Sequence, residues 1–245
     1  MPELPEVEVS RRGLLPILPG QCIVDAVFRA PKLRHEIPSQ LSSRLTGLRI
    51  DAIQRRGKYL LFDCESRHSG GWLLLHLGMS GSLRLVAPGT APQKHDHVDL
   101  VFTATTLRFR DPRRFGTLLW HEGQAIENHP LIAALGIEPL TDAFSGDWLY
   151  EQTRRRSTPI KPLLMDSHLV VGIGNIYAAE SLFAAGISPL RAANRIGRER
   201  YRALAPAIRT VLETSIAAGG SSVRDYVHSD GGAGCFQLSC AVYDR

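Results

Sequence analysis

The first residues of the chain combine two groups that can carry out covalent chemistry. The sequence begins Met1-Pro2-Glu3, and a methionine that precedes a small residue such as proline is commonly removed, which would expose a secondary amine. An α-amino group titrates at about pH 8, so part of it is neutral at physiological pH and can attack an aldehyde carbon to form a cationic Schiff base. Glu3 can exchange protons with the substrate. Pro2 and Glu3 are therefore a candidate nucleophile and proton partner, with an ordinary chain end as the alternative.

The residues after this pair predict a helix that holds it. Pro5 suits a first helical turn, and Glu6 suits the positive end of the helix dipole. One side of the 3.6-residue repeat is apolar, as packing on a core requires. The residues expected on that side are Val7, Leu14, Leu15 and Leu18.

Two basic stretches precede residue 100. Lys58 lies in the stretch at 55–59, at the edge of a predicted strand, where a lysine can reach a phosphate; a solvated strand end is the alternative. The stretch at 94–97 reads Lys-His-Asp-His but lacks further ligands at fixed spacing. We therefore expect a phosphate contact or simple surface exposure there rather than zinc.

The stretch at 111–116 reads Asp-Pro-Arg-Arg-Phe-Gly. Its proline and glycine bracket a turn whose tip presents two guanidinium groups and an aromatic ring. Such a tip suits entry into a nucleic-acid stack and replacement of a displaced base. A hairpin with an anchoring phenylalanine is the alternative.

Further positive charge comes from 154–156 and Lys161. The segment at 170–177 then supplies a glycine turn with Asn175 in position to cap a helix, and exposed amides at a helix N-terminus bind anions such as a DNA phosphate. A structural turn between two helices would use the same residues.

The elements that position these groups fall into two halves. The first half predicts short strands with turn signals between them, typical of a β-sandwich or barrel. From about residue 147 the pattern becomes helical, most clearly at 176–185 and 198–217, and 129–146 is the expected connection. A glycine-rich stretch follows residue 217, and 235–243 is a possible terminal strand. The predicted strands are 23–30, 48–54, 59–63, 72–77, 82–86, 97–102, 106–110 and 117–120.

Composition agrees with a soluble protein that has a sizeable core. The 245 residues are 44% hydrophobic, the formal net charge is +5, and no apolar run is long enough to span a membrane. The N-terminus has no signal-peptide layout, which indicates a cytoplasmic protein. The cysteines form no C-x-x-C pair, so they predict neither zinc nor disulfides and read as reduced structural thiols. The cysteines are Cys22, Cys64, Cys235 and Cys240.

Together these motifs resemble the formamidopyrimidine-DNA glycosylases, which remove oxidised purines from DNA and cut the strand at the resulting abasic site. The resemblance runs through nearly the whole chain in the family's order, and Leu4 favours this branch over the related endonuclease VIII group. The matching pieces are MPELPEVE, QRRGKYLL, HLGMSGSLR, KHDHVDL, DPRRFG, TPIKPLLMD, VVGIGNIYAAESLFAAGI and HSDGGAGCF.

The resemblance implies a catalytic role for three residues. Pro2 becomes the N-terminal residue, and its nitrogen attacks C1′ of the damaged nucleotide, releasing the base and leaving a Schiff base. Glu3 is the acid–base partner, and Lys58 donates a proton and contacts the phosphate beside the lesion. β-Elimination and δ-elimination then cut the strand on both sides of the abasic sugar.

The resemblance also implies DNA-binding residues. Met79, Arg113 and Phe115 match the trio that fills the space of the flipped base and contacts its orphaned partner. The mobile loop that closes over the extruded base corresponds to 221–235. The positions expected to contact the DNA backbone are His95, Arg156, Lys161, Asn175 and Tyr243.

The implied fold class is α+β, an N-terminal β-sandwich with flanking helices plus a C-terminal helix-two-turn-helix domain. We expect a catalytic domain at 1–130, a linker at 131–146, a DNA-binding domain at 147–230, and the end of the lesion loop with the stub of a zinc-finger hairpin at 231–245. Family members carry a zinc ion in that finger. This chain stops at Arg245 before it, so no cofactor is expected here, and we favour a truncated sequence.

The leading prediction is a base-excision-repair glycosylase and abasic-site lyase, acting as a monomer on double-stranded DNA with oxidised bases or abasic sites. One alternative is a lesion-binding module with impaired or no turnover because the finger is missing. Another is a small-molecule tautomerase that uses the proline as a base, although the cationic turn would then have no purpose.

Overall fold

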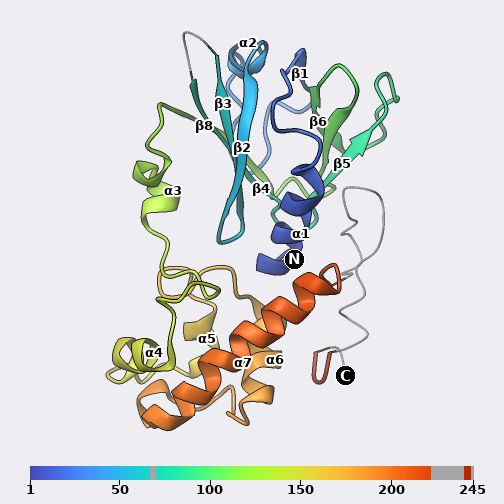
Figure 1. Cartoon of the computed structure of the whole chain (residues 1–245). Coiled ribbons are helices and arrows are strands. Elements are labelled where there is room, and N and C mark those ends of the chain that lie inside the picture. The colour runs from blue at the N-terminus through green and yellow to red at the C-terminus, as the bar shows by residue number, and fades with distance from the viewer. Residues whose placement is uncertain (67–69, 222–239, 244–245) are drawn as a thin grey trace.

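A computed structural model describes residues 1–66, 70–221 and 240–243 of the chain (Figure 1). Within these residues the strands gather in the first half and the longer helices in the second. The helices are α1 (Leu4–Leu14), α2 (Leu41–Leu45), α3 (Pro130–Ala133), α4 (Gly146–Thr153), α5 (Ile160–Leu164), α6 (Asn175–Ala184) and α7 (Arg198–Ala217), with short 3-10 turns at Ile126–Asn128 and Ala193–Arg195. The strands are β1 (Asp25–Phe28), β2 (Arg49–Arg56), β3 (Tyr59–Glu65), β4 (Gly70–His76), β5 (Ser82–Val86), β6 (Asp96–Val101), β7 (Thr106–Arg110) and β8 (Thr117–Glu122).

The first half is a sandwich of two antiparallel sheets, as predicted. One four-stranded sheet has the order β1-β6-β7-β5 and the other has the order β2-β3-β4-β8. Each strand predicted from the sequence is present, with bounds that differ by a few residues at most. The two sheets share one apolar core, to which both contribute side chains.

Strand β4 shows how the alternation of side chains builds this domain. Leu73 and Leu75 point into the core between the sheets. Trp72 and Leu74 point to the opposite face, where Ile126 and its neighbours cover them. Because both faces are covered, the strand reads as a continuous apolar run.

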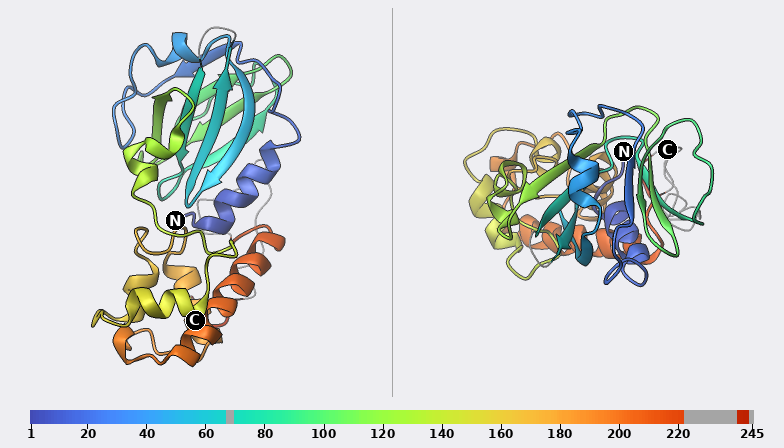
Figure 2. Two further views of the ribbon diagram at one scale, coloured as in Figure 1. Left: turned by 60° about the vertical axis from the view of Figure 1, so that its left-hand side comes forward. Right: turned by 90° about the horizontal axis from the view of Figure 1, so that it is seen from above.

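The second half is a helical domain with a core of its own. Tyr177 of α6 and Tyr201 of α7 are fully buried in it. Helix α7 matches the predicted range 198–217, and α6 begins one residue earlier than predicted. Figures 1 and 2 show the two domains joined end to end, with the N-terminus at their junction.

Helix α1 connects the two cores. Leu4, at its first turn, belongs to the core of the helical domain, whereas Val7 and Leu14 belong to the core of the sandwich. Leu18, just after the helix, also packs in the sandwich. The prediction that Leu15 shares this buried side is wrong, since Leu15 is 37% exposed. A helix that is anchored in both domains holds the residues before it at their junction.

The chain terminus differs in part from the sequence prediction. Residues 235–239 of the predicted strand lie outside the described residues, and 240–243 form a bend and turn rather than a strand. The carboxylate of Glu180 holds this turn by accepting hydrogen bonds from the backbone N–H groups of Ala241, Val242 and Tyr243 at 2.8–3.0 Å. Across the described residues, no helix has the length and apolarity needed to cross a membrane.

Candidate functional site

Pro2 and Glu3 lie at the junction of the two domains. Both are buried, while Met1 in front of them is exposed. Glu3 is the N-cap of α1, and its backbone N–H donates a 2.7 Å hydrogen bond to Oε2 of Glu6 in a reciprocal capping box. The predicted roles of Pro5 and Glu6 in starting the helix are consistent with this cap. The first turn of α1 therefore fixes the backbone next to the candidate nucleophile.

The carboxylate of Glu3 also caps a second helix. It accepts hydrogen bonds from the backbone N–H groups of Gly174 at 2.6 Å, Ile176 at 3.0 Å and Tyr177 at 3.4 Å. Burial raises the pKa of Glu3, and the charge of Lys58 and the bond from Ile176 act in the opposite direction. A buried carboxylate with a raised pKa beside a candidate nucleophile suits a group that exchanges protons with a substrate.

This arrangement corrects one prediction. Asn175 is not the N-cap of α6. The N-cap is Gly174, which has no side chain. Asn175 is the first residue of the helix, and its side chain is exposed. Glu3 supplies the capping oxygens instead. Gly174 is required at this close approach, because a Cβ there would lie 2.4 Å from Cδ of Glu3.

A buried network surrounds the carboxylate of Glu6. Its Oε1 accepts hydrogen bonds from the hydroxyl of Tyr177 at 2.5 Å and from the backbone N–H and hydroxyl of Ser221 at 2.8 and 2.9 Å. The hydroxyl of Tyr177 also lies 2.6 Å from that of Ser215 on α7. The beginning of the predicted lesion loop is thus tied to the helix that carries Pro2; the rest of that loop lies outside the described residues.

Lys58 reaches the same region from the hairpin between β2 and β3. Its Nζ donates a 3.3 Å hydrogen bond to the backbone carbonyl of Ile173, directly before the turn that Glu3 caps. Burial lowers the pKa of Lys58, while the charges of Glu3 and Glu6 raise it by a smaller amount. Lys58 and Glu3 are therefore an electrostatically coupled pair, brought together from two separate sequence motifs.

The two arginines before Lys58 have a structural role. Arg55 pairs with Glu8 at 3.1 Å and with Glu138 at 2.9 Å, and Arg56 pairs with Glu138 at 3.2 Å. Glu138 also accepts a 2.6 Å hydrogen bond from the backbone N–H of Gly57. The basic stretch at 55–59 thus binds the two domains together, and only Lys58 within it points to the site.

The turn at 111–116 is organised by a buried aspartate. Oδ2 of Asp111 accepts a 2.7 Å hydrogen bond from the backbone N–H of Gly116, and Oδ1 accepts one from the hydroxyl of Ser80, also at 2.7 Å. The guanidinium of Arg113 lies over the ring of Phe115, 4.8 Å from its centroid. Phe115 is nevertheless 44% exposed, as is Met79 at 41%. The side chains predicted to enter DNA are therefore accessible to a ligand at the surface.

The stretch at 94–97 is only partly exposed. Asp96 and His97 are buried in β6, where Nε2 of His97 lies 2.9 Å from the backbone carbonyl of Asp111. The prediction of simple surface exposure is wrong for these two residues. His95 is half-buried, adopts a positive φ of 77°, and accepts a 3.0 Å hydrogen bond from the backbone N–H of Asp111 on its carbonyl. Its backbone is thus fixed on the 111–116 turn.

His76 is a candidate site residue that the sequence argument missed. Its ring packs on that of Tyr59 at 4.9 Å, and its Nδ1 accepts a 2.9 Å hydrogen bond from the backbone N–H of Gly78. Burial and the positive charges of Lys58 and Arg34 lower its pKa to about 4. A neutral imidazole beside Lys58 can donate a hydrogen bond to a phosphate. The signal was its place at the start of the motif HLGMSGSLR, in which only Met79 was assigned a role from the sequence.

The remaining predicted DNA contacts belong to the helical domain. Arg156 and Asn175 are exposed, and Lys161 on α5 is half-buried. Tyr243 is half-buried against the helical core, with its backbone held by Glu180. Asn175 lies next to the candidate site, because its neighbours Gly174 and Ile176 both donate hydrogen bonds to Glu3. Arg156, Lys161 and Tyr243 lie on other segments of the helical domain, a distribution expected of contacts along an extended ligand.

The described residues provide no set of ligands for a zinc ion. No group of three or more histidine, cysteine, aspartate or glutamate side chains among them is placed to hold a metal. Cys22 is exposed, whereas Cys64 and Cys240 are buried, and burial raises the pKa of the Cys64 thiol to about 12. Cys235 lies outside the described residues.

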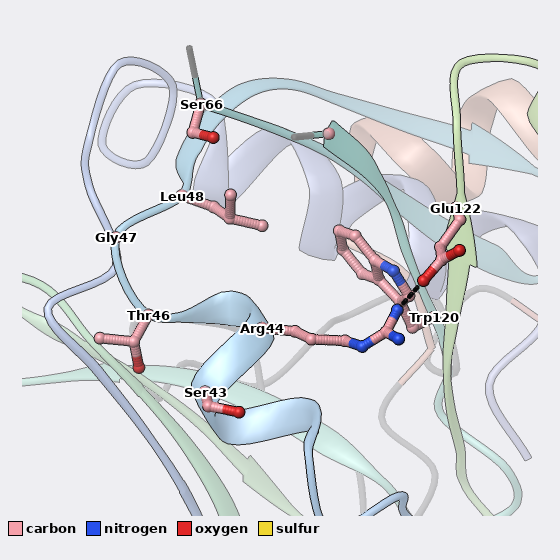
Figure 3. Close-up of a pocket in the computed structure, with 9 residues that line it drawn as sticks. Ser43, Arg44, Thr46, Gly47, Leu48, Ser66, Trp120 and Glu122 are labelled. Atoms are coloured by element: carbon pink, nitrogen blue, oxygen red, sulfur yellow. Dashed lines mark hydrogen bonds and ion pairs between the residues drawn. The ribbon is translucent and has the colours of Figure 1, made fainter. Parts of the chain in front are cut away.

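A hollow of about 570 Å³ lies away from this site, near α2 at the end of the sandwich distant from the N-terminus (Figures 1 and 3). Its lining includes Trp120 and an ion pair between Arg44 and Glu122. None of the predicted catalytic residues, Pro2, Glu3 and Lys58, lines it. The volume of this hollow is therefore no reason to place the reactive site there.

Comparison with known families agrees with this geometry. The family model for the formamidopyrimidine-DNA glycosylase N-terminal domain matches residues 1–118, and the model for the formamidopyrimidine-DNA glycosylase H2TH domain matches residues 135–227. A formamidopyrimidine-DNA glycosylase of Dechloromonas aromatica is 65% identical over 247 residues, covering 100% of this chain and 89% of that protein. One of Ralstonia nicotianae is 52% identical over 258 residues, covering 100% of this chain and 90% of that protein.

Solved structures show the same relationship. The Fpg protein of Thermus thermophilus superposes with a TM-score of 0.86 at 40% identity, covering 100% of this chain and 88% of that one. The Fpg of Lactococcus lactis in complex with DNA that contains an abasic site superposes with a TM-score of 0.89 at 35% identity, covering 98% and 88%.

Proposed function

The chain belongs to the formamidopyrimidine-DNA glycosylase family, and from this premise we propose that it is a base-excision-repair DNA glycosylase and abasic-site lyase that acts through Pro2. The observation that carries the proposal is the convergence of Pro2, Glu3 and Lys58 at the junction of the domains. The Lactococcus lactis relative is seen with abasic-site DNA, which supports the same class of ligand here.

The glycosylase step begins after removal of Met1. The nitrogen of Pro2 attacks C1′ of the damaged nucleotide, and the bond from C1′ to the base breaks with its electron pair leaving on the base, which takes up a proton. Opening of the sugar ring then gives a cationic Schiff base between Pro2 and C1′. Glu3 is the group placed to move protons at this centre, because its carboxylate is adjacent to Pro2 and its pKa is raised.

The lyase step follows from the charge of the Schiff base. Its positive nitrogen withdraws electrons, so C2′ loses a proton and the 3′ phosphate leaves by β-elimination. A second loss of a proton allows the 5′ phosphate to leave by δ-elimination, and water releases the sugar remnant from Pro2. Lys58, held near Glu3 by the Ile173 carbonyl, is placed to contact a phosphate beside the lesion and to donate a proton.

The exposed residues supply the DNA contacts. Met79, Arg113 and Phe115 would fill the space left by the extruded base, since all three side chains are exposed. Arg113 and Phe115 lie in the turn at 111–116, and Met79 is next to Ser80, which bonds to Asp111. We propose that the protein acts in the cytoplasm as a monomer on double-stranded DNA that contains oxidised purines or abasic sites.

Borohydride trapping tests this mechanism. The protein, with loss of Met1 verified by mass spectrometry, is incubated with a duplex that contains 8-oxoguanine and with borohydride. We expect a covalent adduct whose linkage maps to Pro2, and strand products of β,δ-elimination without borohydride. Glu3→Gln should lower the rate of adduct formation on the 8-oxoguanine duplex. A chain that has lost Met1, binds the duplex and gives neither adduct nor cleavage would show the Schiff-base assignment to be wrong.

A further inference from the structure

A cationic pocket lies on the helical domain between the end of α6 and the start of α7. Its volume is about 320 Å³, and its lining contains Arg191, Arg195 and Arg200 but no acidic side chain. All three arginines are exposed. In Figure 1 this segment is drawn in orange at the foot of the molecule, at the far end from the sandwich. We call these three residues the distal arginine cluster.

Two side chains of this cluster, those of Arg191 and Arg200, donate hydrogen bonds to backbone carbonyls rather than to carboxylates. Nε and Nη2 of Arg191 donate hydrogen bonds to the carbonyl of Arg195 at 3.3 and 3.2 Å, and Nη2 of Arg200 donates one to the carbonyl of Gly186 at 2.5 Å. In the part of the chain that the structure describes, none of the three forms an ion pair. The side chains of Arg191 and Arg200 are therefore restrained, while the charges of all three arginines remain available.

Two neighbouring arginines of α7, in contrast, form ion pairs with carboxylates. Arg198 pairs with Asp147 at 3.0 Å and with Glu151 at 2.6 Å, and Arg202 pairs with Asp147 at 3.0 Å and with Glu199 at 2.8 Å. The first turns of α7 thus have one side whose charges are compensated within the domain and one side whose charges are not. Uncompensated arginines on one side of a small domain are what an anionic partner would neutralise.

The cluster is continuous with the predicted DNA-binding segment. The backbone N–H of Asn194 donates to the carbonyl of Arg156 at 2.9 Å, that of Ile160 donates to the carbonyl of Arg191 at 2.9 Å, and that of Lys161 donates to the carbonyl of Pro189 at 3.3 Å. Segments 156–161 and 189–194 therefore run side by side. One carries Arg156 and Lys161, and the other leads into the distal arginine cluster.

We propose that the distal arginine cluster binds backbone phosphates of the duplex that flanks the lesion, extending the DNA footprint of the helical domain beyond Lys161. The proposal rests on the proposed function, because it takes lesion-containing DNA as the ligand. A planar guanidinium binds a phosphate through two parallel hydrogen bonds, and such contacts add affinity without reading sequence. The cluster would strengthen binding to long DNA and leave the chemistry at Pro2 unchanged.

Salt-dependent binding to two duplexes tests this proposal. One duplex has about one helical turn, about 12 base pairs centred on the lesion, and the other has about 40 base pairs. Each phosphate contact contributes about 0.9 to the slope of log K against log salt. We expect Arg191→Gln/Arg195→Gln to lower the slope by about 1 to 2 on the long duplex only, with a corresponding loss of affinity at physiological salt.

The matched control is Arg198→Gln/Arg202→Gln, which removes the same charge from arginines that are already paired. It should leave both slopes unchanged, and thermal melting verifies that both variants are folded. Equal slopes for the Arg191/Arg195 variant and the unsubstituted protein on long DNA would overturn the proposal, as would an equal loss on both duplexes. The proposal would also be overturned if the Arg191/Arg195 variant lost binding of free inorganic phosphate but kept the salt slopes of the unsubstituted protein on both duplexes. Borohydride trapping on the short duplex tests the proposed function independently of the cluster. The Arg191→Gln/Arg195→Gln variant should form the adduct at an unchanged rate in this assay.

Discussion

The backbone N–H of Gly174 donates a 2.6 Å hydrogen bond to Oε2 of Glu3, although 171 positions separate the two residues. The helical domain thereby holds the carboxylate that we propose as the acid–base group. The site is therefore a product of both domains, and a change in either one is expected to alter the chemistry.

Gly174→Ala should impair activity without unfolding the protein. The new methyl group would lie 2.4 Å from Cδ of Glu3, so the carboxylate must move away from Pro2. We expect the trapping rate to fall about 100-fold, the scale of an ångström misplacement at a reacting centre. The control is Gly197→Ala, another helix N-cap glycine, where a Cβ meets open space. Equal rates for the two variants would contradict this account of Gly174.

Tyr177→Phe should destabilise the junction. It removes the hydroxyl that bonds to Glu6 at 2.5 Å and to Ser215 at 2.6 Å, and it leaves both partners buried. We expect the free energy of unfolding in urea to fall by about 1–3 kcal/mol. Tyr150→Phe is the control, because no hydrogen bond of its hydroxyl is found among the described residues, and its effect should stay within about 0.5 kcal/mol.

Stability should depend on Glu8 below pH 4.5. Burial raises the pKa of Glu8, but hydrogen bonds from Arg11 and Arg12 and the charges of Arg11 and Arg55 outweigh it and lower the pKa to about 2. Protonation thus favours the unfolded chain, so the stability that Glu8 supplies is complete above pH 4.5 and is lost as the pH falls toward about 2. The stability gap between the unsubstituted protein and Glu8→Gln, measured by urea unfolding, should narrow across that range. Glu199→Gln, which removes an exposed ion pair, should show no such change.

DNA binding should weaken at alkaline pH through Lys58. Burial lowers its pKa below the ordinary 10.5, and the charge that holds a phosphate is lost once the pH exceeds that lowered pKa. We expect the affinity for abasic-site DNA to fall at a pH below that at which an exposed lysine titrates. Lys58→Arg keeps its charge throughout, so its affinity should show a flatter pH profile; parallel profiles would argue against the role of Lys58.

Phe115→Ala should slow base excision while leaving the fold intact. The ring is 44% exposed and is held beside Arg113, so its loss removes a group that can stack in DNA but little of the core. Stacking of a base on an aromatic ring contributes about 1–3 kcal/mol, so the excision rate should fall about fivefold or more. Phe183→Ala removes another exposed ring, 59% accessible, and should leave excision unchanged.

Local patterns predicted much of this molecule. Short strand-like runs separated by turn signals were sufficient to predict the strands of the sandwich, and the helical pattern was sufficient to predict α6 and α7. Pro5 and Glu6 form the expected helix start. Such features depend on neighbours in the sequence, whose spacing is visible without a structure. The chemistry proposed for Pro2 and Glu3 also rests on residue types alone, and it stays a prediction.

The tertiary structure decided which groups meet. Asn175 has the residue type of an N-cap, yet Glu3 caps α6 because the first turn of α1 inserts between the domains and brings a carboxylate to the free amides. Arg55 and Arg56 have the composition of a phosphate site, yet Glu138 pairs with both. In each case the partner lies far away in the sequence. Residue type and spacing specify what a side chain can do, whereas the packing of α1 into two cores specifies which partner it reaches.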